Sequence, residues 1–252
     1  MRSTFRMVEW MLGYDRLDRL FTEAAVSDEP MPYLARLAKR FGFDIRVEGN
    51  EQIPESGPTV IVANHPFGGA DAIAVGTFVL RQRSDTKILA NQFLASVAPL
   101  SQTLIGVDVY GGPDSKGRNL DGIRKASRHL GAGGCLVVFP AGEVASWRMK
   151  SRSVEEGPWS PHVAALAIRH RATAVPIFVP GRNSVLFHLL GLIHPRLRTA
   201  WLGRELLRSR GRRITLRVDA SRVSDHNDDP ARLINDIRRR IAPSAIPNQK
   251  IS

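Results

Sequence analysis

A histidine and an aspartate stand close together after an apolar run, and the two could perform general base chemistry. His65 follows the run at 60–63, and five residues separate it from Asp71. A carboxylate that accepts one imidazole N–H fixes the tautomer of the ring and raises its basicity. The pair could therefore take a proton from a hydroxyl group. The alternative without chemistry is a surface histidine beside an aspartate that caps a helix.

The turn between these two residues contains groups that could bind a substrate. Glycine lets the backbone fold back closely, and N–H groups at the start of a helix point away from it. Such N–H groups suit the oxyanion of a tetrahedral intermediate. The candidates for substrate binding in this turn are Asn64, Phe67, Gly68 and Gly69.

Two more apolar runs, at 135–139 and 174–179, end in turns that carry polar residues. The carboxyl ends of parallel strands meet at one edge of a sheet, where binding sites form. An arginine and an asparagine there could bind an anionic headgroup or a carbonyl group. The candidates for substrate binding in these two turns are Pro140, Gly142, Glu143, Arg182 and Asn183.

Short apolar runs alternate with helical patterns from residue 42 onward. Several of the runs are rich in Val and Ile on both faces, as buried parallel strands are. The alternation predicts an α/β fold, a single layered domain with a mostly parallel central sheet flanked by helices. The predicted strands are residues 45–47, 59–63, 87–90, 104–109, 135–139, 174–179 and 214–218. The predicted helices are residues 71–81, 119–130, 161–170 and 230–241.

Two stretches stand outside this alternation. Residues 1–41 are predicted to form an N-terminal helical segment ahead of the domain at 42–252, either packed on the sheet or lying in a membrane interface. Residues 184–192 are nearly uncharged but too short to cross a bilayer. This second stretch is either core or an exposed apolar patch that meets lipid or an acyl chain, and we favour the core.

Composition limits the possible functions. The 252 residues include 36 Lys and Arg against 24 Asp and Glu, a net charge of +12. Such an excess attracts polyanions, namely nucleic acid, anionic lipid or an acidic carrier protein. One Cys excludes a disulfide framework and a Cys-rich zinc site, and the histidines lack the spacing of metal ligands. We therefore expect no metal site. We also find no secretory signal or membrane span, so we expect a cytoplasmic protein.

The motifs at 64–71, 139–144 and 181–184 resemble those of a bacterial branch of the lysophospholipid acyltransferase superfamily. This branch contains glycerolphosphate-acyltransferase-like enzymes, hemolysin-like relatives and those that complete ornithine lipids. The resemblance covers roughly residues 40 to 220. It implies that His65 is the general base, that Asp71 orients it, and that the donor is acyl carrier protein or coenzyme A. The implied acceptor is the hydroxyl of a lysolipid, a lysophospholipid or a lyso-amino-acid lipid, at the inner face of the cell membrane.

This sequence departs from the family pattern in three places. The family has four residues between the His and the Asp, and Ala141 stands where its third motif carries an acid. The segment 104–112 lacks the usual Arg of the second motif, for which Arg118, Arg148 or Arg182 could substitute. An acyl thioester is already activated, so the reaction requires no cofactor. The enzymatic interpretation requires His65 and Asp71 to lie together beside a groove wide enough for a fatty tail.

Two other functions remain open. A thioester hydrolase could use the same pair with water as acceptor. A nucleic-acid-binding protein would account for the basic stretch at 196–217 and for Arg238 to Arg240, but the motifs of the common nucleic-acid-binding modules are absent from the sequence.

Overall fold

A central sheet of seven strands organises the computed structural model, which describes residues 13–26, 31–49, 52–95, 98–108, 115–219 and 229–241. The strands lie in the order β1-β9-β8-β2-β5-β3-β4. Among the described pairings within this seven-stranded sheet, only that of β8 with β9 is antiparallel, which confirms the predicted mostly parallel sheet. The strands are β1 (Asp44–Gly49), β2 (Thr59–Ala63), β3 (Lys87–Asn91), β4 (Leu104–Val107), β5 (Cys135–Val138), β8 (Thr173–Phe178) and β9 (Arg213–Val218).

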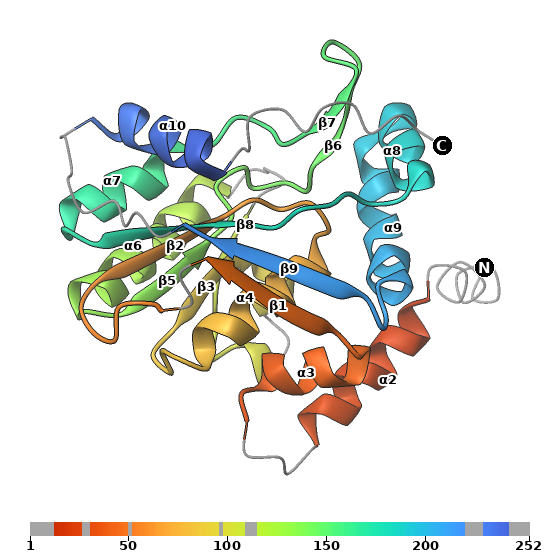
Figure 1. Cartoon of the computed structure of the whole chain (residues 1–252), viewed down its shortest axis with the longest axis horizontal. Helices are drawn as coiled ribbons and strands as arrows, with labels where there is room; N and C mark the ends of the chain where they lie inside the picture. The colour runs from red at the N-terminus through yellow and green to blue at the C-terminus, as the bar shows by residue number, and fades with distance from the viewer. Residues whose placement is uncertain are drawn as a thin grey trace.

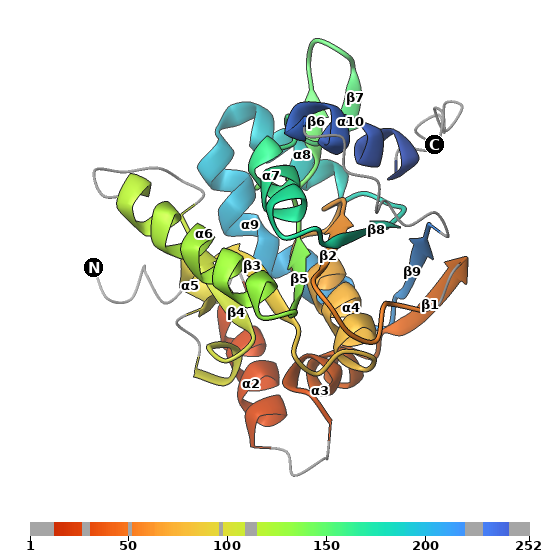
Figure 2. The same cartoon turned by 90° about the vertical axis from the view of Figure 1, so that its left-hand side faces the viewer.

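Helices cover both faces of this sheet (Figure 1). The described helices are α2 (Tyr14–Ala25), α3 (Tyr33–Phe41), α4 (Gly69–Leu80), α5 (Gln92–Ala95), α6 (Ser115–Gly131), α7 (Pro161–Arg169), α8 (Val185–Ile193), α9 (Pro195–Arg208) and α10 (Pro230–Ile241). A short 3₁₀ turn, Ala98–Leu100, precedes β4. Figure 2 shows α2 and α3 below the sheet and α7 and α10 above it.

Strand β2 runs through the centre of the sheet because its residues are apolar on both sides. Ile61 and Ala63 point into a core cluster shared with α3 and α4, whereas Val60 and Val62 point into a second cluster shared with α6, α7 and α10. Alternate strand residues face opposite sides, so a Val and Ile run can fill both cores. His65 therefore lies just beyond the carboxyl end of β2, at the edge of the sheet.

The described part of the N-terminal segment belongs to the same body. Leu34, Leu37 and Phe41 of α3 join the core cluster that α4 covers, and Leu17 of α2 packs against it. These helices therefore pack on the fold, which was one of the two predicted arrangements. Residues 1–12 lie outside the described residues, and the domain boundary predicted at residue 42 stays a prediction.

The segment 184–192 does not form core, so our preference for the core was wrong. It folds into α8, where Phe187 and His188 are buried while Val185, Leu186 and Leu189 are exposed. A short apolar run does not reveal how many of its faces will find a partner. The sequence interpretation also missed α9 and a small hairpin of β6 (Ser146–Arg148) and β7 (Ser153–Glu155). None of the described helices combines the length and the hydropathy that a membrane crossing requires.

Candidate active site

His65 and Asp71 lie together, as the sequence predicted. The Nδ1 atom of His65 is 2.9 Å from Oδ1 of Asp71. The contact has the distance of an ion pair, although its alignment falls short of a full hydrogen bond. The Asp71 side chain is fully buried, whereas that of His65 is 18% exposed. The ring therefore has one nitrogen directed at a buried carboxylate, while part of its surface reaches solvent.

The backbone of His65 is held by two segments that follow β5. Its carbonyl oxygen accepts the N–H of Ala145 at 2.9 Å, and its N–H donates to the carboxylate of Glu156. The His65 ring also packs against Phe139, with the ring centroids 4.3 Å apart. The turn after β2 and the loop after β5 therefore meet at this histidine, as expected for neighbouring parallel strands.

Asp71 also organises the turn that precedes it. Its Oδ2 atom accepts the N–H of Phe67 at 2.7 Å and that of Gly68 at 3.2 Å. The expectation that the N–H of Gly68 is directed outward for an oxyanion is therefore wrong, because the carboxylate three residues later accepts it. Gly69 begins α4, and N–H groups in the first turn of a helix have no partner within that helix.

Two buried charges perturb the titration of the site. Burial lowers the pKa of His65, but the negative charges of Asp71 and Glu156 outweigh it, so the net pKa is raised above the ordinary value. Burial raises the pKa of Glu156, although the N–H of His65 and the indole N–H of Trp159 oppose the increase. Trp159 donates to the Oε2 atom of Glu156 at 2.8 Å.

The sequence interpretation did not identify Glu156. This residue follows Glu155 in a polar segment, and no spacing relates it to a histidine 91 positions earlier. Only the fold brings the two together. Its neighbour Trp159 is buried in the second core cluster, so Glu156 connects that core to the backbone of His65.

The turns after β2 and β8 are also joined. The Asn64 side chain donates to the carbonyl of Val179 at 2.9 Å and accepts its N–H at 2.6 Å. Asn183 is buried and donates to the carbonyl of Phe67 at 3.4 Å. The ring of Phe67 packs directly on Gly181, where a Cβ atom would collide with it. Asn64, Phe67 and Asn183 thus hold two motif turns together, and their predicted binding of substrate stays a prediction.

Glu143 connects the turn after β5 to two other elements. Its carboxylate pairs with Arg148 of β6 and, at 2.6 Å, with Arg198 of α9. Burial would raise the pKa of Glu143, but the two guanidinium groups hold it below its usual value. Pro140 is buried, and its carbonyl accepts the N–H of Ser160.

Gly142 and Arg182 are the exposed members of the predicted set. Gly142 has a φ of 65° in the turn after β5, where no atom lies within contact distance of an added Cβ. Arg182 lies three residues before α8 with its side chain exposed to solvent. Arg118 is part of α6, but the structure does not describe its side chain.

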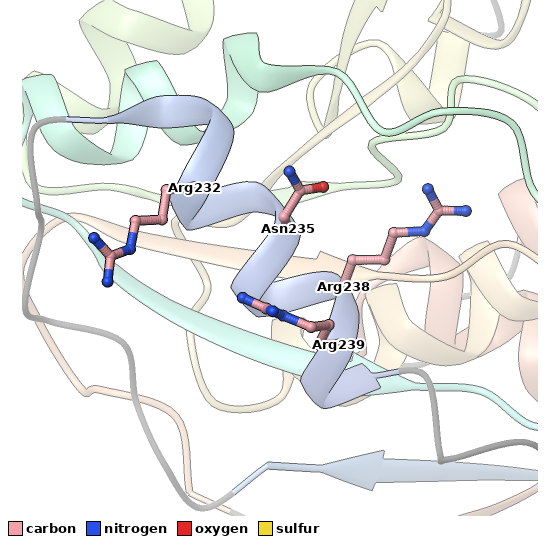
Figure 3. A pocket seen from close by; sticks show the side chains of 4 residues that line it. All are labelled: Arg232, Asn235, Arg238 and Arg239. Carbon is pink, nitrogen blue, oxygen red and sulfur yellow. The ribbon is translucent and has the colours of Figure 1, made fainter.

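A surface cavity of about 540 Å³ lies along α10, lined by Arg232, Asn235, Arg238 and Arg239 (Figure 3). None of these residues belongs to the predicted site. The side chains of Arg232 and Arg238 point away from each other, so they do not converge on one ligand (Figure 3). The groove for a fatty tail beside His65 stays a prediction.

Comparison with known proteins connects this geometry to a family. The lyso-glycine lipid O-acyltransferase of Phocaeicola vulgatus is 25% identical over 181 residues, which are 69% of this chain and 62% of that protein. The enzyme of the same name from Bacteroides thetaiotaomicron is 26% identical over 148 residues, 58% of this chain and 52% of that protein. The chain thus matches a little more than half the length of these curated relatives.

A solved structure and a family model complete the comparison. The 1-acyl-sn-glycerophosphate acyltransferase of Thermotoga maritima aligns with a TM-score of 0.48 and 15% identity, over 94% of this chain and 89% of that one. The family model described as Acyltransferase matches residues 19–224. That match includes the turns after β2, β5 and β8 and covers most of the 252 residues, so this chain belongs to the acyltransferase family.

Proposed function

We propose that this protein is an O-acyltransferase that moves a fatty acyl group from a thioester to the hydroxyl of a lysolipid. The observation that carries the proposal is the pair of His65 and Asp71, 2.9 Å apart at the carboxyl end of β2. Membership of the acyltransferase family supports the reaction class. The names of the two curated relatives support a lysolipid acceptor, a lysophospholipid or a lyso-amino-acid lipid.

In the proposed reaction His65 acts as a general base. With its Nδ1 proton directed at Asp71, its Nε2 atom takes the proton of the acceptor hydroxyl. The resulting oxygen nucleophile attacks the carbonyl carbon of the thioester and forms a tetrahedral oxyanion. Collapse of this intermediate breaks the C–S bond, and the leaving thiolate takes the proton from the imidazolium. Because the thioester is already activated, the reaction needs no covalent acyl-enzyme, cofactor or metal.

The remaining residues position the reactants in this proposal. The N–H of Gly69, at the start of α4, is the group that we assign to the oxyanion. Arg182 is exposed beside the buried Asn183 and is suited to an anionic headgroup. Glu143 acts through its two arginine partners, because both of its oxygens are engaged by them.

The proposal includes the donor and the place of action. The donor is acyl carrier protein or coenzyme A, and the enzyme works as a peripheral protein on the inner face of the cell membrane. The net charge of +12 supports both partners, since acidic carrier proteins and anionic lipids are attracted to a basic surface.

Product identification tests this function. The purified protein is incubated with an isotope-labelled acyl carrier protein thioester or acyl-CoA and, one at a time, with lysophospholipids and lyso-amino-acid lipids. Mass spectrometry should find the label in a diacylated lipid with at least one acceptor. Label found only in free fatty acid, at a rate independent of every lysolipid, would instead identify a thioester hydrolase.

A further inference from the structure

Exposed apolar side chains gather on one face of α8. Positions 185, 186, 189, 192 and 193 fall on a single stripe of an α-helix, opposite the buried Phe187. Ile193 is 73% exposed and Leu189 is 51% exposed. Leu197, in the first turn of α9, extends the same exposed set. We call these residues the α8 surface: Val185, Leu186, Leu189, Leu192, Ile193 and Leu197.

This concentration stands out from the rest of the described chain. Eleven large hydrophobic side chains are exposed in the parts that the structure describes, and six of them belong to the α8 surface. A seventh, Met149, is 70% exposed between β6 and β7, and β6 contacts α8. Figure 1 shows α8 and α9 stacked at one side of the molecule, with the hairpin beside α8. An apolar surface of this kind marks a site of interaction with a protein or a membrane.

The charged residues in the segment that forms α8 and the start of α9 are all basic. No Asp or Glu occurs between Glu156 and Glu205 in the sequence. Both of these carboxylates are turned inward, Glu156 to the backbone of His65 and Glu205 to Ser184, the residue that caps α8. Arg182 and Arg196, close to the two ends of α8, are exposed. The surface is therefore apolar in the middle, with an exposed arginine close to each end of α8.

The same helices are tied to the candidate active site. Asn183, just before the cap of α8, donates to the carbonyl of Phe67 in the turn that carries His65. Arg198 of α9 pairs with Glu143 in the turn after β5. A partner on the α8 surface would therefore lie beside the motif turns.

We propose that the α8 surface is the face by which this protein rests on an anionic lipid bilayer. The inference builds on the proposed function, because a lysolipid acceptor keeps its acyl chain in the bilayer and its hydroxyl at the interface. A helix with one apolar face and cations beside it lies in the plane of the membrane interface. Docked in this way, the enzyme has its motif turns beside the headgroup region, where the acceptor hydroxyl is found.

A second copy of the chain is the main alternative occupant. In a two-fold symmetric dimer each patch contacts itself, so the arginines at the margins of one copy would face those of the other. Like charges opposed across an interface disfavour association. An anionic headgroup layer complements these arginines instead, which is why we assign the surface to lipid.

The test compares vesicle binding by matched variants. The full chain is mixed with vesicles of equal parts phosphatidylglycerol and phosphatidylcholine, or of phosphatidylcholine alone, and floated on a density gradient. L189E/I193E adds two acids to the α8 surface. V26E/L120E adds two acids at other exposed hydrophobic positions, since Val26 is 73% and Leu120 48% exposed. Thermal melting of each variant checks that it is folded.

The wild type and V26E/L120E should float with the anionic vesicles, and L189E/I193E should float at least about tenfold less. Equal flotation of the two variants would overturn the inference. So would light scattering that showed a dimer dissociated by L189E/I193E in the absence of lipid.

The proposed function is tested separately with a short-chain lysolipid that stays monomeric in solution. Wild type and L189E/I193E should acylate this acceptor at similar rates. A protein that floats but transfers no acyl group to any acceptor would refute the function and leave the docking surface standing. A protein that transfers acyl groups without floating would refute the docking surface and leave the proposed function standing.

Discussion

His65 is held from three directions, and each contact comes from a different part of the chain. Asp71 faces its ring from α4, Ala145 donates to its carbonyl, and Glu156 accepts its N–H. A catalytic base works best when it is already in place before the substrate arrives, because the cost of ordering it has been met during folding. Replacing the carboxylate of Asp71 and replacing that of Glu156 should therefore have different effects on activity, and each effect can be measured.

Replacing Asp71 with Asn should lower acyl transfer. The amide lacks the charge that stabilises an imidazolium, and its NH₂ group can reverse the tautomer of His65. We expect kcat to fall by about 10²-fold or more, measured as the initial rate of product formation. Asp236→Asn, on the surface of α10, is the matched control and should keep the wild-type rate. A rate for Asp71→Asn close to that of wild type would show that the pair has no catalytic role.

Glu156→Gln should change how activity depends on pH. The base must be neutral to accept a proton, so a raised pKa of His65 places the acid limb of kcat/KM above the ordinary histidine value. The charge of Glu156 contributes to that rise, and Gln removes it. The acid limb should therefore move to lower pH in Glu156→Gln.

The neighbouring Glu155→Gln is the control for this shift, because Glu155 is exposed and bonds Ser153 rather than His65. Its acid limb should stay where the wild-type limb lies. An acid limb that Glu156→Gln left in place, or moved to higher pH, would contradict the claim that the charge of Glu156 helps to raise the pKa of His65.

The same residues show what local patterns can predict. His65 and Asp71 are near in sequence, on either side of a turn between a strand and a helix, so their proximity followed from the pattern. Glu156 acts across 91 positions, and no local pattern encodes such a contact. The prediction that the N–H of Gly68 would be available to an oxyanion was wrong, because this N–H donates to the carboxylate of Asp71 instead. The sequence pattern does not show which of these two acceptors the group will bind.

At the scale of elements, side-chain hydrogen bonds hold the ends of the strands in place. Asn64 bonds both backbone groups of Val179, and this contact joins the ends of β2 and β8 across 115 positions of sequence. The parallel pairing of these strands ends at Ala63 and Ile177, so the asparagine continues the ladder one step further by means of its side chain. The turn that carries His65 is thereby fixed to the turn that leads to α8.

Asn64→Ala should destabilise the protein. The substitution leaves the N–H and C=O of Val179 without their partner, which costs roughly 1–3 kcal/mol for each buried group. We expect the free energy of unfolding, measured with urea, to fall by about 2 kcal/mol or more. Asn235→Ala, on the exposed face of α10, should leave it unchanged. Equal stability of the two variants would refute the structural role of Asn64.

The centre of the sheet could be predicted because β2, β5 and β8 are buried on both sides. Such strands are continuous apolar runs, and the predicted bounds of β2 and of α10 agree with the structure. The hairpin of β6 and β7 could not be predicted, since its strands have three residues each and carry polar side chains. The segment of α8 was misjudged because apolar composition is the same for a buried helix and for one that awaits a partner outside the chain.

At the scale of the whole molecule, the distribution of charge determines which surfaces attract the protein. The net charge of +12 and the acid-free stretch around α8 create a long-range attraction to anionic surfaces. Salt screens such attraction over about 8 Å at physiological ionic strength. The apolar contact of the α8 surface is not screened in this way, so the two contributions can be separated.

Binding to anionic vesicles should therefore weaken as salt is added but should not vanish. Between dilute buffer and physiological salt we expect the bound fraction, measured by flotation, to correspond to an affinity reduced severalfold. The residual binding at high salt should be lost in L189E/I193E. Binding that disappeared entirely with salt in the wild type would mean that the apolar face makes no contact with lipid.

The central claim is that His65 removes the proton from the acceptor hydroxyl. The most direct measurement is the rate of labelled diacyl lipid formation by His65→Ala and by the bulkier His65→Gln, each compared with wild type under saturating donor and lysolipid. Both variants should melt like the wild type yet form product at least about 10²-fold more slowly. Product formed by either folded variant at the wild-type rate would contradict the account.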